Sequence, residues 1–226
     1  MNIANDKVTE YIGSLYRPLS EHLAELRKTG EKGHIPIILK DSERLLVCLV
    51  EMLRPARILE IGTAIGYSAA VFATACVNAG LDTEITTVEA DPLYAGDARR
   101  NLTGYDNVTL VEDDGCRYMN EISCCDGSET DGSCGGTFDL IFIDAAKSHY
   151  REFWDAAVKL TRKGSVIVCD NILMQGKTVD DSYDERGRFV TNIKYMRDFL
   201  DYISSWEGAA TSLLSVGDGM SISVIR

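Results

Sequence analysis

The sequence has no apolar run long enough to span a lipid bilayer, which takes about 20 consecutive apolar residues. Polar residues stand near its start, where a secretory signal peptide needs a basic residue and then an apolar stretch. Its seven cysteines are odd in number, and Cys48, Cys76 and Cys169 fall within predicted core elements. Such a set does not suit a disulfide framework. We therefore expect a cytoplasmic protein with reduced thiols and no membrane partner.

Positive charge is in deficit, because 23 Lys and Arg residues oppose 35 Asp and Glu residues, for a formal net charge of −12. Nucleic acids favour basic surfaces, so this balance disfavours an RNA partner. The acidic excess is local, however. Residues 82–139 carry fourteen acids and three arginines, whereas residues 172–200 carry five acids and five bases. The net charge therefore lowers the expectation of RNA binding without excluding it.

No internal repeat and no Pro-rich linker divides the chain, and 226 residues suit one α/β domain over 1–226. Apolar positions at helical spacing predict a helical segment over 8–28 that is interrupted near Pro18. A second helix is expected to be capped at Asp41 and to run to about Leu53. Residues 1–54 are therefore predicted to form an N-terminal helical cover.

From residue 57 onward, short apolar runs alternate with helical patterns. This alternation predicts right-handed βαβ units and a doubly wound, Rossmann-like α/β sheet. After a helix near 187–205, the Gly217-Asp-Gly between two more apolar runs is a hairpin signal, so the last strand should be antiparallel. We expect strands at 57–61, 84–89, 108–111, 138–144, 165–170, 209–216 and 220–226, and intervening helices at about 67–79, 92–102, 115–122 and 149–162.

Residues 123–137 are small, polar and rich in glycine, which predicts a flexible surface insertion. Cys124, Cys125 and Cys134 lie within it. Three thiols without a fourth ligand at finger-like spacing make a poor zinc site, so we assign no metal to this segment.

A Gly-x-Gly-x-x-Gly pattern, which admits the pyrophosphate of a dinucleotide, is missing after the first predicted strand. Instead, residues 60–68 read EIGTAIGYS, and Gly62 and Gly66 bracket a tight turn into a helix, which lets a ligand approach the backbone. Glu60 would repel phosphate but suits a cationic or amine-bearing ligand such as the methionine part of S-adenosylmethionine. The pattern thus argues against an NAD-dependent oxidoreductase.

Acidic residues also end the next two predicted strands. Glu89 closes the second strand, where a carboxylate suits the two hydroxyls of a ribose. Asp114 and Gly115 follow the third strand, where a carboxylate can accept a hydrogen bond from an adenine amino group. These strand ends predict a nucleoside pocket at the carboxyl edge of the sheet. The alternative is an ordinary strand–helix turn with solvated acids.

Oxygen-bearing side chains end the fourth and fifth strands: Asp144 ends the fourth, and Asp170 and Asn171 end the fifth. An all-oxygen, partly anionic set suits a hard divalent ion such as Mg²⁺, although a single Asp at a strand end is more often a helix cap. Lys147 lies where it could take a proton from an acceptor hydroxyl or stabilise its oxyanion, although its position alone equally suits a surface lysine. His149 receives no role.

In combination, residues 60–68, 143–150, 169–173 and 217–224 resemble the metal-dependent O-methyltransferases of the catechol and caffeoyl-CoA type. The resemblance runs from about residue 10 to the end and omits only 123–137. It implies a seven-stranded methyltransferase fold, S-adenosylmethionine as cofactor, and a homodimer built by the leading helices. It also implies the following site: a divalent metal at Asp144, Asp170 and Asn171, Lys147 as the base-like residue, and a cofactor pocket that includes Ile38 and Ser68.

Within this family, residues 34–38, 170–177 and 186–200 are most similar to the bacterial branch that contains tRNA 5-hydroxyuridine methyltransferase. One metal could chelate the 5-hydroxyl and O4 of 5-hydroxyuracil much as it chelates a catechol. Our first hypothesis is therefore tRNA wobble-uridine methylation, the alternative is a small catechol or phenol, and a remote third is a silent nucleoside-binding scaffold. Four bases that could meet phosphates (Arg186, Arg188, Lys194, Arg197) are offset by four acids (Asp180, Asp181, Asp184, Glu185).

Overall fold

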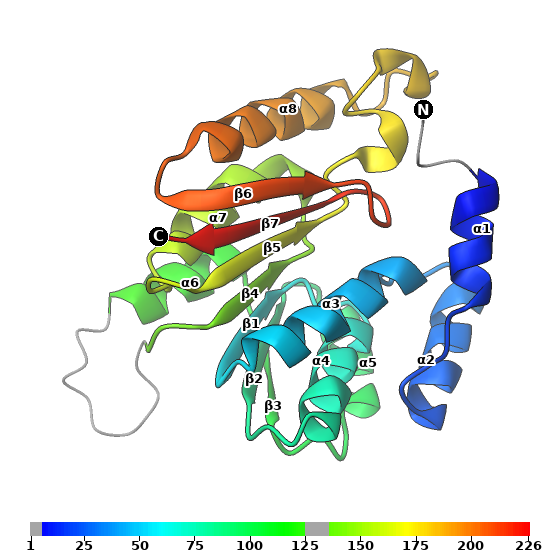
Figure 1. Cartoon of the computed structure of the whole chain (residues 1–226), viewed down its shortest axis with the longest axis vertical. Coiled ribbons are helices and arrows are strands. Elements are labelled where there is room, and N and C mark those ends of the chain that lie inside the picture. Colours follow the sequence, from blue (N-terminus) through cyan, green and yellow to red (C-terminus); the bar gives the residue numbers. More distant parts are fainter. Residues whose placement is uncertain (1–5, 125–135) are drawn as a thin grey trace.

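Seven strands form one mixed sheet in the order β3-β2-β1-β4-β5-β7-β6 in the computed structural model, which describes residues 6–124 and 136–226 (Figure 1). The first five strands are parallel, and β7 pairs antiparallel with both β5 and β6. The predicted seven-stranded, doubly wound α/β sheet with an antiparallel last strand is therefore confirmed. The strands are β1 (Arg57–Ile61), β2 (Glu84–Glu89), β3 (Val108–Glu112), β4 (Leu140–Ile143), β5 (Val166–Asp170), β6 (Ala209–Leu214) and β7 (Met220–Ile225).

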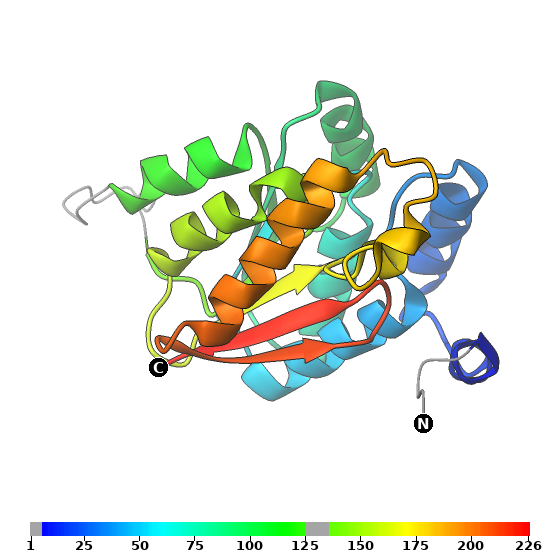
Figure 2. The same ribbon diagram turned by 90° about the horizontal axis from the view of Figure 1, so that it is seen from above.

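Helices cover both faces of this sheet (Figures 1 and 2). Most of them follow the helical patterns expected from the sequence, and three short 3-10 turns add to them. They are α1 (Asp6–Ser14), α2 (Glu21–Lys32), α3 (Lys40–Leu53), α4 (Tyr67–Asn78), α5 (Pro92–Asn101), α6 (Gly115–Ser123), α7 (Tyr150–Val158) and α8 (Val190–Ser205), with the 3-10 turns η1 (Lys147–His149), η2 (Met174–Gly176) and η3 (Asp181–Tyr183).

Alternate residues of the central strands β1, β4 and β5 pack into two hydrophobic cores, as the two-residue period of a strand requires. In β4, Phe142 packs with α3 and α4, whereas the next residue, Ile143, packs with α7 and α8. The second core gathers large aromatic side chains such as Trp154 and Phe199, which are buried in edge-to-face contact. Because both faces are covered, ligand access is left to the ends of the strands.

The register brings the functional strand ends to one edge of the sheet. Ile61 lies opposite Val88 in the parallel β1–β2 pair, and Ile143 lies opposite Cys169 in the β4–β5 pair. The residues that follow these positions therefore emerge side by side. In the antiparallel pair, Asp170 lies opposite Met220, which sets the start of β7 beside the end of β5.

Several local predictions differ from the structure. The predicted cap at Asp41 is wrong: α3 begins at Lys40 without a side-chain cap, and Asp41 accepts from the amides of Ser42 (3.1 Å) and Gly217 (2.9 Å). Helix α8 begins at Val190, later than expected, and the amides of Arg188 and Phe189 just before it donate to the Asp184 carboxylate. Cys48, expected in the core, is exposed on α3.

Other predictions agree with the described residues or fall outside them. The leading helical segment is split between α1 and α2, and the break includes Pro18. Cys76 and Cys169 are buried, and neither forms a disulfide. None of the helices within the described ranges has the length and apolar character needed to cross a membrane. Most of the predicted insertion at 123–137 lies outside the described residues.

Candidate active site

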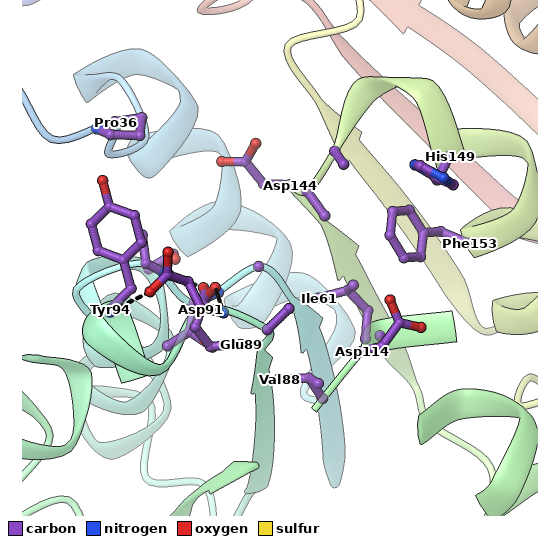
Figure 3. A pocket seen from close by; sticks show the side chains of 18 of the residues that line it. Pro36, Ile61, Val88, Glu89, Asp91, Tyr94, Asp114, Asp144, His149 and Phe153 are labelled. Carbon is purple, nitrogen blue, oxygen red and sulfur yellow. Dashed lines mark hydrogen bonds between the residues drawn. The ribbon is translucent and has the colours of Figure 1, made fainter. Parts of the chain in front are cut away.

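A cavity of about 720 Å³ opens at the carboxyl ends of β1, β2 and β4. The loops after these strands and after β3 form its floor, and Pro36 and Ile38 from the N-terminal cover contribute to its wall (Figure 3). Nearly all of the predicted cofactor residues line it. Those in contact with the cavity are Ile38, Gly62, Ser68, Glu89, Asp114, Gly115 and Asp144, while Glu60 and Gly66 lie behind its surface.

The two glycines after β1 serve the packing of the turn. Gly62 has a φ of +97°, and a Cβ there would lie 2.0 Å from the carbonyl oxygen of Asp144. Gly66 has a φ of +86°, begins α4, and would place a Cβ 3.0 Å from Leu102. Only glycine combines this left-handed backbone with so little space. The predicted tight turn is present, and close packing against neighbouring segments explains both glycines.

Glu89 is held at the junction of two loops. Its carboxylate accepts from the amides of Thr63 (3.1 Å), Ala64 (2.7 Å) and Asp91 (2.9 Å). Asp91 in turn caps α5 by accepting from the Leu93 amide at 2.8 Å. The carboxylate is thus fixed by the backbone at the corner of the cavity, where a pair of hydroxyls would need it.

Asp91 and Tyr94 line the same corner of the cavity, and the sequence analysis did not single them out (Figure 3). The available signal was the Asp91-Pro92 pair, which is typical of a helix start and not of a binding residue. Helix-start residues of this kind reach a cavity only because the parallel strands place the helix N-terminus at its rim.

Asp114 and Gly115 stand at the start of α6. Asp114 caps this helix by accepting from the Arg117 amide at 2.8 Å, and it also faces the cavity. Gly115 allows α6 to approach β1, because a Cβ there would lie 2.5 Å from Ile61. His149 and Phe153 line the same side of the cavity, with ring centroids 6.3 Å apart (Figure 3). His149, for which no role was predicted, is therefore a cavity residue.

Glu60 is completely buried beneath the cavity floor. One carboxylate oxygen accepts from the Thr87 hydroxyl, and the other has no partner. Burial raises the pKa of Glu60 to about 7, with further upward contributions from Asp144 and Glu89, against the hydrogen bond from Thr87. Direct contact between Glu60 and a ligand amine stays a prediction, since the carboxylate does not line the cavity.

Lys147 connects the ends of β4 and β5. Its ammonium nitrogen lies 2.8 Å from Asp144 Oδ1, 2.8 Å from Asn171 Oδ1 and 2.8 Å from the Tyr150 hydroxyl oxygen. The side chain is 22% exposed. This lysine is therefore held among oxygen atoms at the cavity edge and is not a freely solvated surface residue.

Asp170 is 1% exposed, and its two oxygens are in different environments. Oδ1 accepts from the Asn171 amide at 2.7 Å, while Oδ2 is buried without a partner. Burial raises the pKa of Asp170 to about 7, and the nearby negative charge of Asp144 adds to this effect. A buried carboxylate oxygen with no donor is suited to a cation.

Tyr150 is a further residue that the sequence analysis did not identify. It is fully buried and donates from its hydroxyl to the backbone carbonyl of Asp170 at 2.7 Å, while it accepts from Lys147. Burial raises its pKa well above the usual value, so the hydroxyl keeps its proton. Tyr150 thereby links the position of Lys147 to the end of β5.

The described residues contain no group of three or more His, Cys, Asp or Glu side chains with metal-binding geometry. The predicted metal set has a different composition, with the two carboxylates of Asp144 and Asp170 and the amide oxygen of Asn171. The structure places Asp144 and Asn171 around the same ammonium nitrogen, and Asp170 next to Asn171. Divalent hard ions bind carboxylate and carbonyl oxygens of this kind.

Curated proteins similar to this chain include two O-methyltransferases. A catechol O-methyltransferase of Niastella koreensis is 28% identical over 90% of this chain and 89% of its own length. A caffeoyl-CoA O-methyltransferase of Populus kitakamiensis is 28% identical over 94% of this chain and 89% of its own length.

Solved structures show the same fold. A protein of Staphylococcus aureus, provisionally assigned as a caffeoyl-CoA O-methyltransferase, superposes with a TM-score of 0.84 at 27% identity, covering 98% of this chain and 100% of its own. An O-methyltransferase of Bacillus cereus in complex with SAH has a TM-score of 0.78 at 25% identity, with 97% of each chain covered. The model of the O-methyltransferase family matches residues 13–225. The chain therefore belongs to the O-methyltransferase family of enzymes.

Proposed function

We propose that this enzyme transfers a methyl group from S-adenosylmethionine to the hydroxyl of a small phenolic acceptor that carries a second oxygen beside it, with a divalent metal at Asp144, Asp170 and Asn171. The observation that carries this proposal is the oxygen cluster around Lys147 at the edge of a nucleoside-sized cavity. Membership of an enzyme family argues against a silent scaffold.

The cavity supports S-adenosylmethionine as the methyl donor. Glu89 would accept from the ribose hydroxyls, and Asp114 would accept from the adenine amino group, with His149 and Phe153 beside it. Ser68, Ile38 and Asp144 would surround the methionine end. The Bacillus cereus relative was solved with SAH, the demethylated product of this cofactor.

The residues at the ends of β4 and β5 fit a divalent metal. The unpartnered Oδ2 of Asp170 and the position of the Lys147 ammonium between Asp144 and Asn171 both indicate a place that favours positive charge. A bound Mg²⁺ supplies Lewis acidity, which lowers the pKa of an acceptor hydroxyl. Asp144, Asp170 and Asn171 would hold it through oxygen atoms.

Lys147 would act on the acceptor oxygen. Its ammonium is oriented by Tyr150, so it can stabilise an acceptor oxyanion or, as the neutral amine, accept the hydroxyl proton. The acceptor oxygen then forms a bond with the methyl carbon as the bond from that carbon to sulfur breaks. The cover residues Pro36 and Ile38 line the cavity and would keep water from this region.

A small acceptor is the main proposal because the catechol and caffeoyl-CoA relatives both carry small substrates in their names. A tRNA 5-hydroxyuridine acceptor is a second candidate, and one observation favours it. Arg186, Arg188 and Lys194 are exposed near the start of α8, free to meet phosphates. The fourth predicted base, Arg197, is occupied by the carbonyl of Thr178 at 2.8 Å and by an ion pair with Asp181.

The acids that were expected to oppose phosphate binding are partly occupied as well. Asp180 caps η3 through the Ser182 amide at 2.8 Å. Asp184 accepts from the amides of Arg188 (3.1 Å) and Phe189 (2.8 Å) at the start of α8. Since these carboxylates are turned toward the backbone, they repel a phosphate less than free surface acids would. Glu185 is exposed.

Labelled S-adenosylmethionine and Mg²⁺, offered with a catechol panel or with tRNA containing 5-hydroxyuridine, test the proposal. We expect transfer to catechols, abolished by a chelator and lowered about 10²- to 10⁴-fold by Lys147→Met. The matched control Lys163→Met removes an exposed lysine elsewhere and should retain full activity. Methyl transfer to tRNA but not to catechols would refute the small acceptor in favour of 5-hydroxyuridine. Activity that survives the chelator or Asp170→Ala would refute the metal mechanism.

We also propose a homodimer built by the leading helices. Helix α1 exposes large apolar side chains, with Tyr11 at 66% and Ile12 at 51% exposure, and Leu15 follows at 58%. A groove formed by α1 and the start of α3 runs beside them. An exposed apolar surface of this kind marks a protein interface.

A further inference from the structure

The turn between β6 and β7 joins two parts of the molecule that are distant in sequence. This β6–β7 turn (residues 215–219) lies beside the end of β5 because β7 pairs antiparallel with that strand. The Gly217 amide donates to Asp41 Oδ2 at 2.9 Å, and the Gly219 carbonyl accepts from the Ile172 amide at 3.0 Å. The turn therefore connects the start of α3 to the loop that follows β5.

The β5 loop (residues 171–176) has an unusual backbone. Asn171, Met174 and Gln175 have φ angles of 55°, 50° and 57°, although none of them is glycine. A non-glycine residue in this left-handed region is strained, and the conformation persists only where neighbouring structure imposes it. The strain lies next to Asp170 and includes the proposed metal ligand Asn171, so the loop needs an external anchor.

Asp218 supplies this anchor twice. Its backbone carbonyl accepts from the Leu173 amide at 2.9 Å, and its carboxylate Oδ1 accepts from the Gln175 amide. The glycines on each side leave no room for side chains: a Cβ on Gly217 would lie 2.2 Å from Ser42 Oγ, and one on Gly219 would lie 2.3 Å from Leu173 Cγ. The turn is therefore fitted between α3 and the β5 loop, and Asp218 points to the loop.

The Asp218 carboxylate lies in the electrostatic field of the same site. Lys147 and Lys177 stabilise its negative charge, whereas Asp144 opposes it. Asp218 in turn contributes to the raised pKa of Asp170. A charge at this place therefore acts on a bound cation through space, and that effect has to be separated from the hydrogen bond to Gln175.

We propose that Asp218 is a positioning residue that holds the β5 loop, and with it Asn171, in the geometry required for metal binding and for the acceptor. The proposal rests on the proposed function for the role of Asn171. The Gly217-Asp-Gly motif would then do more than form the hairpin turn, because the Asp218 carboxylate holds the loop through the Gln175 amide. Within the β5 loop, only Asn171 lines the cofactor cavity, whereas Asp218 and residues 172–176 do not.

Two variants separate the hydrogen bond from the charge. Asp218→Ala removes both, whereas Asp218→Asn removes the charge and retains an oxygen that accepts from Gln175. We expect Asp218→Ala to weaken Mn²⁺ binding about tenfold or more, as loss of an outer-shell partner does, and to speed hydrogen exchange at the Gln175 amide about tenfold. Asp218→Asn should remain close to the parent protein in both measurements.

The matched control is Asp201→Ala, which removes an exposed carboxylate of α8 and should change neither quantity. SAH affinity, measured by calorimetry, should stay the same in all three variants, because a general loss of structure would lower it as well. If Asp218→Asn binds Mn²⁺ as weakly as Asp218→Ala, the charge acts and the positioning role is wrong. Unchanged exchange at Gln175 in Asp218→Ala also overturns it.

These outcomes are distinct from failure of the proposed function. If the parent protein binds no divalent ion and methylates no catechol, the proposed function fails, while the exchange rate of the Gln175 amide in the metal-free protein still decides whether Asp218 anchors the loop. Melting temperatures of the variants, compared with the parent, show that each one is folded under the conditions of measurement.

Discussion

A carboxyl group without solvent contact lies beneath the cofactor end of the sheet. Glu60 accepts one hydrogen bond from Thr87, and its second oxygen has no donor. The ionised form is therefore poorly stabilised, and the pKa of Glu60 is raised from 4.5 to about 7. Because the folded state binds this proton more tightly than the unfolded state, Glu60 lowers the stability of the protein as the pH rises between these two values.

Replacement of this carboxyl group should remove its contribution to the loss of stability with rising pH. Relative to the parent protein, Glu60→Gln should gain about 3 kcal/mol in free energy of unfolding between pH 4 and pH 8, since one pKa unit corresponds to about 1.4 kcal/mol. Urea unfolding at the two pH values measures the difference. Glu185→Gln, which changes an exposed carboxylate, is the control and should show no trend. A constant difference between Glu60→Gln and the parent would contradict the raised pKa.

Residue positions were predictable where a strand ends in a polar residue, and residue roles were less so. The pattern placed Glu89 and Asp144 on the cavity wall correctly. It did not indicate that Glu60 lies below the cavity floor. A strand residue faces one side of the sheet or the other according to the pleat, and the sequence pattern around Glu60 is the same in either case. The role of Tyr150 at the start of α7 was not predicted, because its partner is the backbone carbonyl of Asp170 in β5 and a backbone partner leaves no signal in the sequence.

At the scale of elements, a buried network fastens the N-terminal cover to the cofactor side of the sheet. Arg27 of α2 donates to Glu43 of α3 at 2.8 Å, to Tyr67 of α4 at 3.0 Å and to the carbonyl of Ile38 at 2.9 Å. Tyr67 and Ile38 both line the cavity. The Arg27–Glu43 ion pair and the hydrogen bond from Arg27 to Tyr67 therefore join three helices and hold one wall of the cavity.

Breaking this pair should be costly because Glu43 is fully buried. Arg27→Met is expected to lower the free energy of unfolding by about 3–5 kcal/mol, the range for an uncompensated buried charge. Adding Glu43→Gln removes that charge and should recover part of the loss. Denaturant unfolding measures both, and Arg44→Met, which alters an exposed arginine of α3, should stay within about 0.5 kcal/mol of the parent. Equal losses for the single and double variants would argue against a buried charge effect.

Elements formed by local sequence patterns were predicted closely, and those that depend on distant contacts were not. The β1 and β2 bounds match the expected ranges, since alternation and flanking turns are local signals. The start of α3 differs because Asp41 bonds to Gly217, 176 residues away, in place of capping its own helix. The start of α8 differs because the Asp184 carboxylate accepts from the amides of Arg188 and Phe189, a side-chain contact that apolar periodicity does not indicate.

At the scale of the whole molecule, charge and apolar surface are unevenly distributed. The acidic segment 82–139 supplies most of the net charge, whereas the exposed apolar side chains of α1 lie at the N-terminal side. The exposed apolar side chains of α1 favour association. Self-association is therefore expected through α1.

Light scattering after size exclusion tests this expectation. We expect the parent protein at twice the mass of one chain, 24.9 kDa. The variant Ile12→Asp/Leu15→Asp, which places charge within the apolar surface, should elute as a monomer. Val77→Asp charges an equally exposed apolar residue on α4 and should leave the dimer intact. A monomeric parent protein, or a dimer that tolerates both charges, would rule out this interface.

The insertion of β7 between β5 and β6 has a consequence for synthesis on the ribosome. When β5 leaves the exit tunnel, its neighbour on one side does not yet exist, because β7 is made about fifty residues later. Until β7 is made, β5 keeps one edge of unpaired backbone hydrogen-bonding groups, and such an edge can pair with a wrong strand. The half of the sheet that contains β5 is thus completed last, and we expect the need for chaperones to concentrate in that interval.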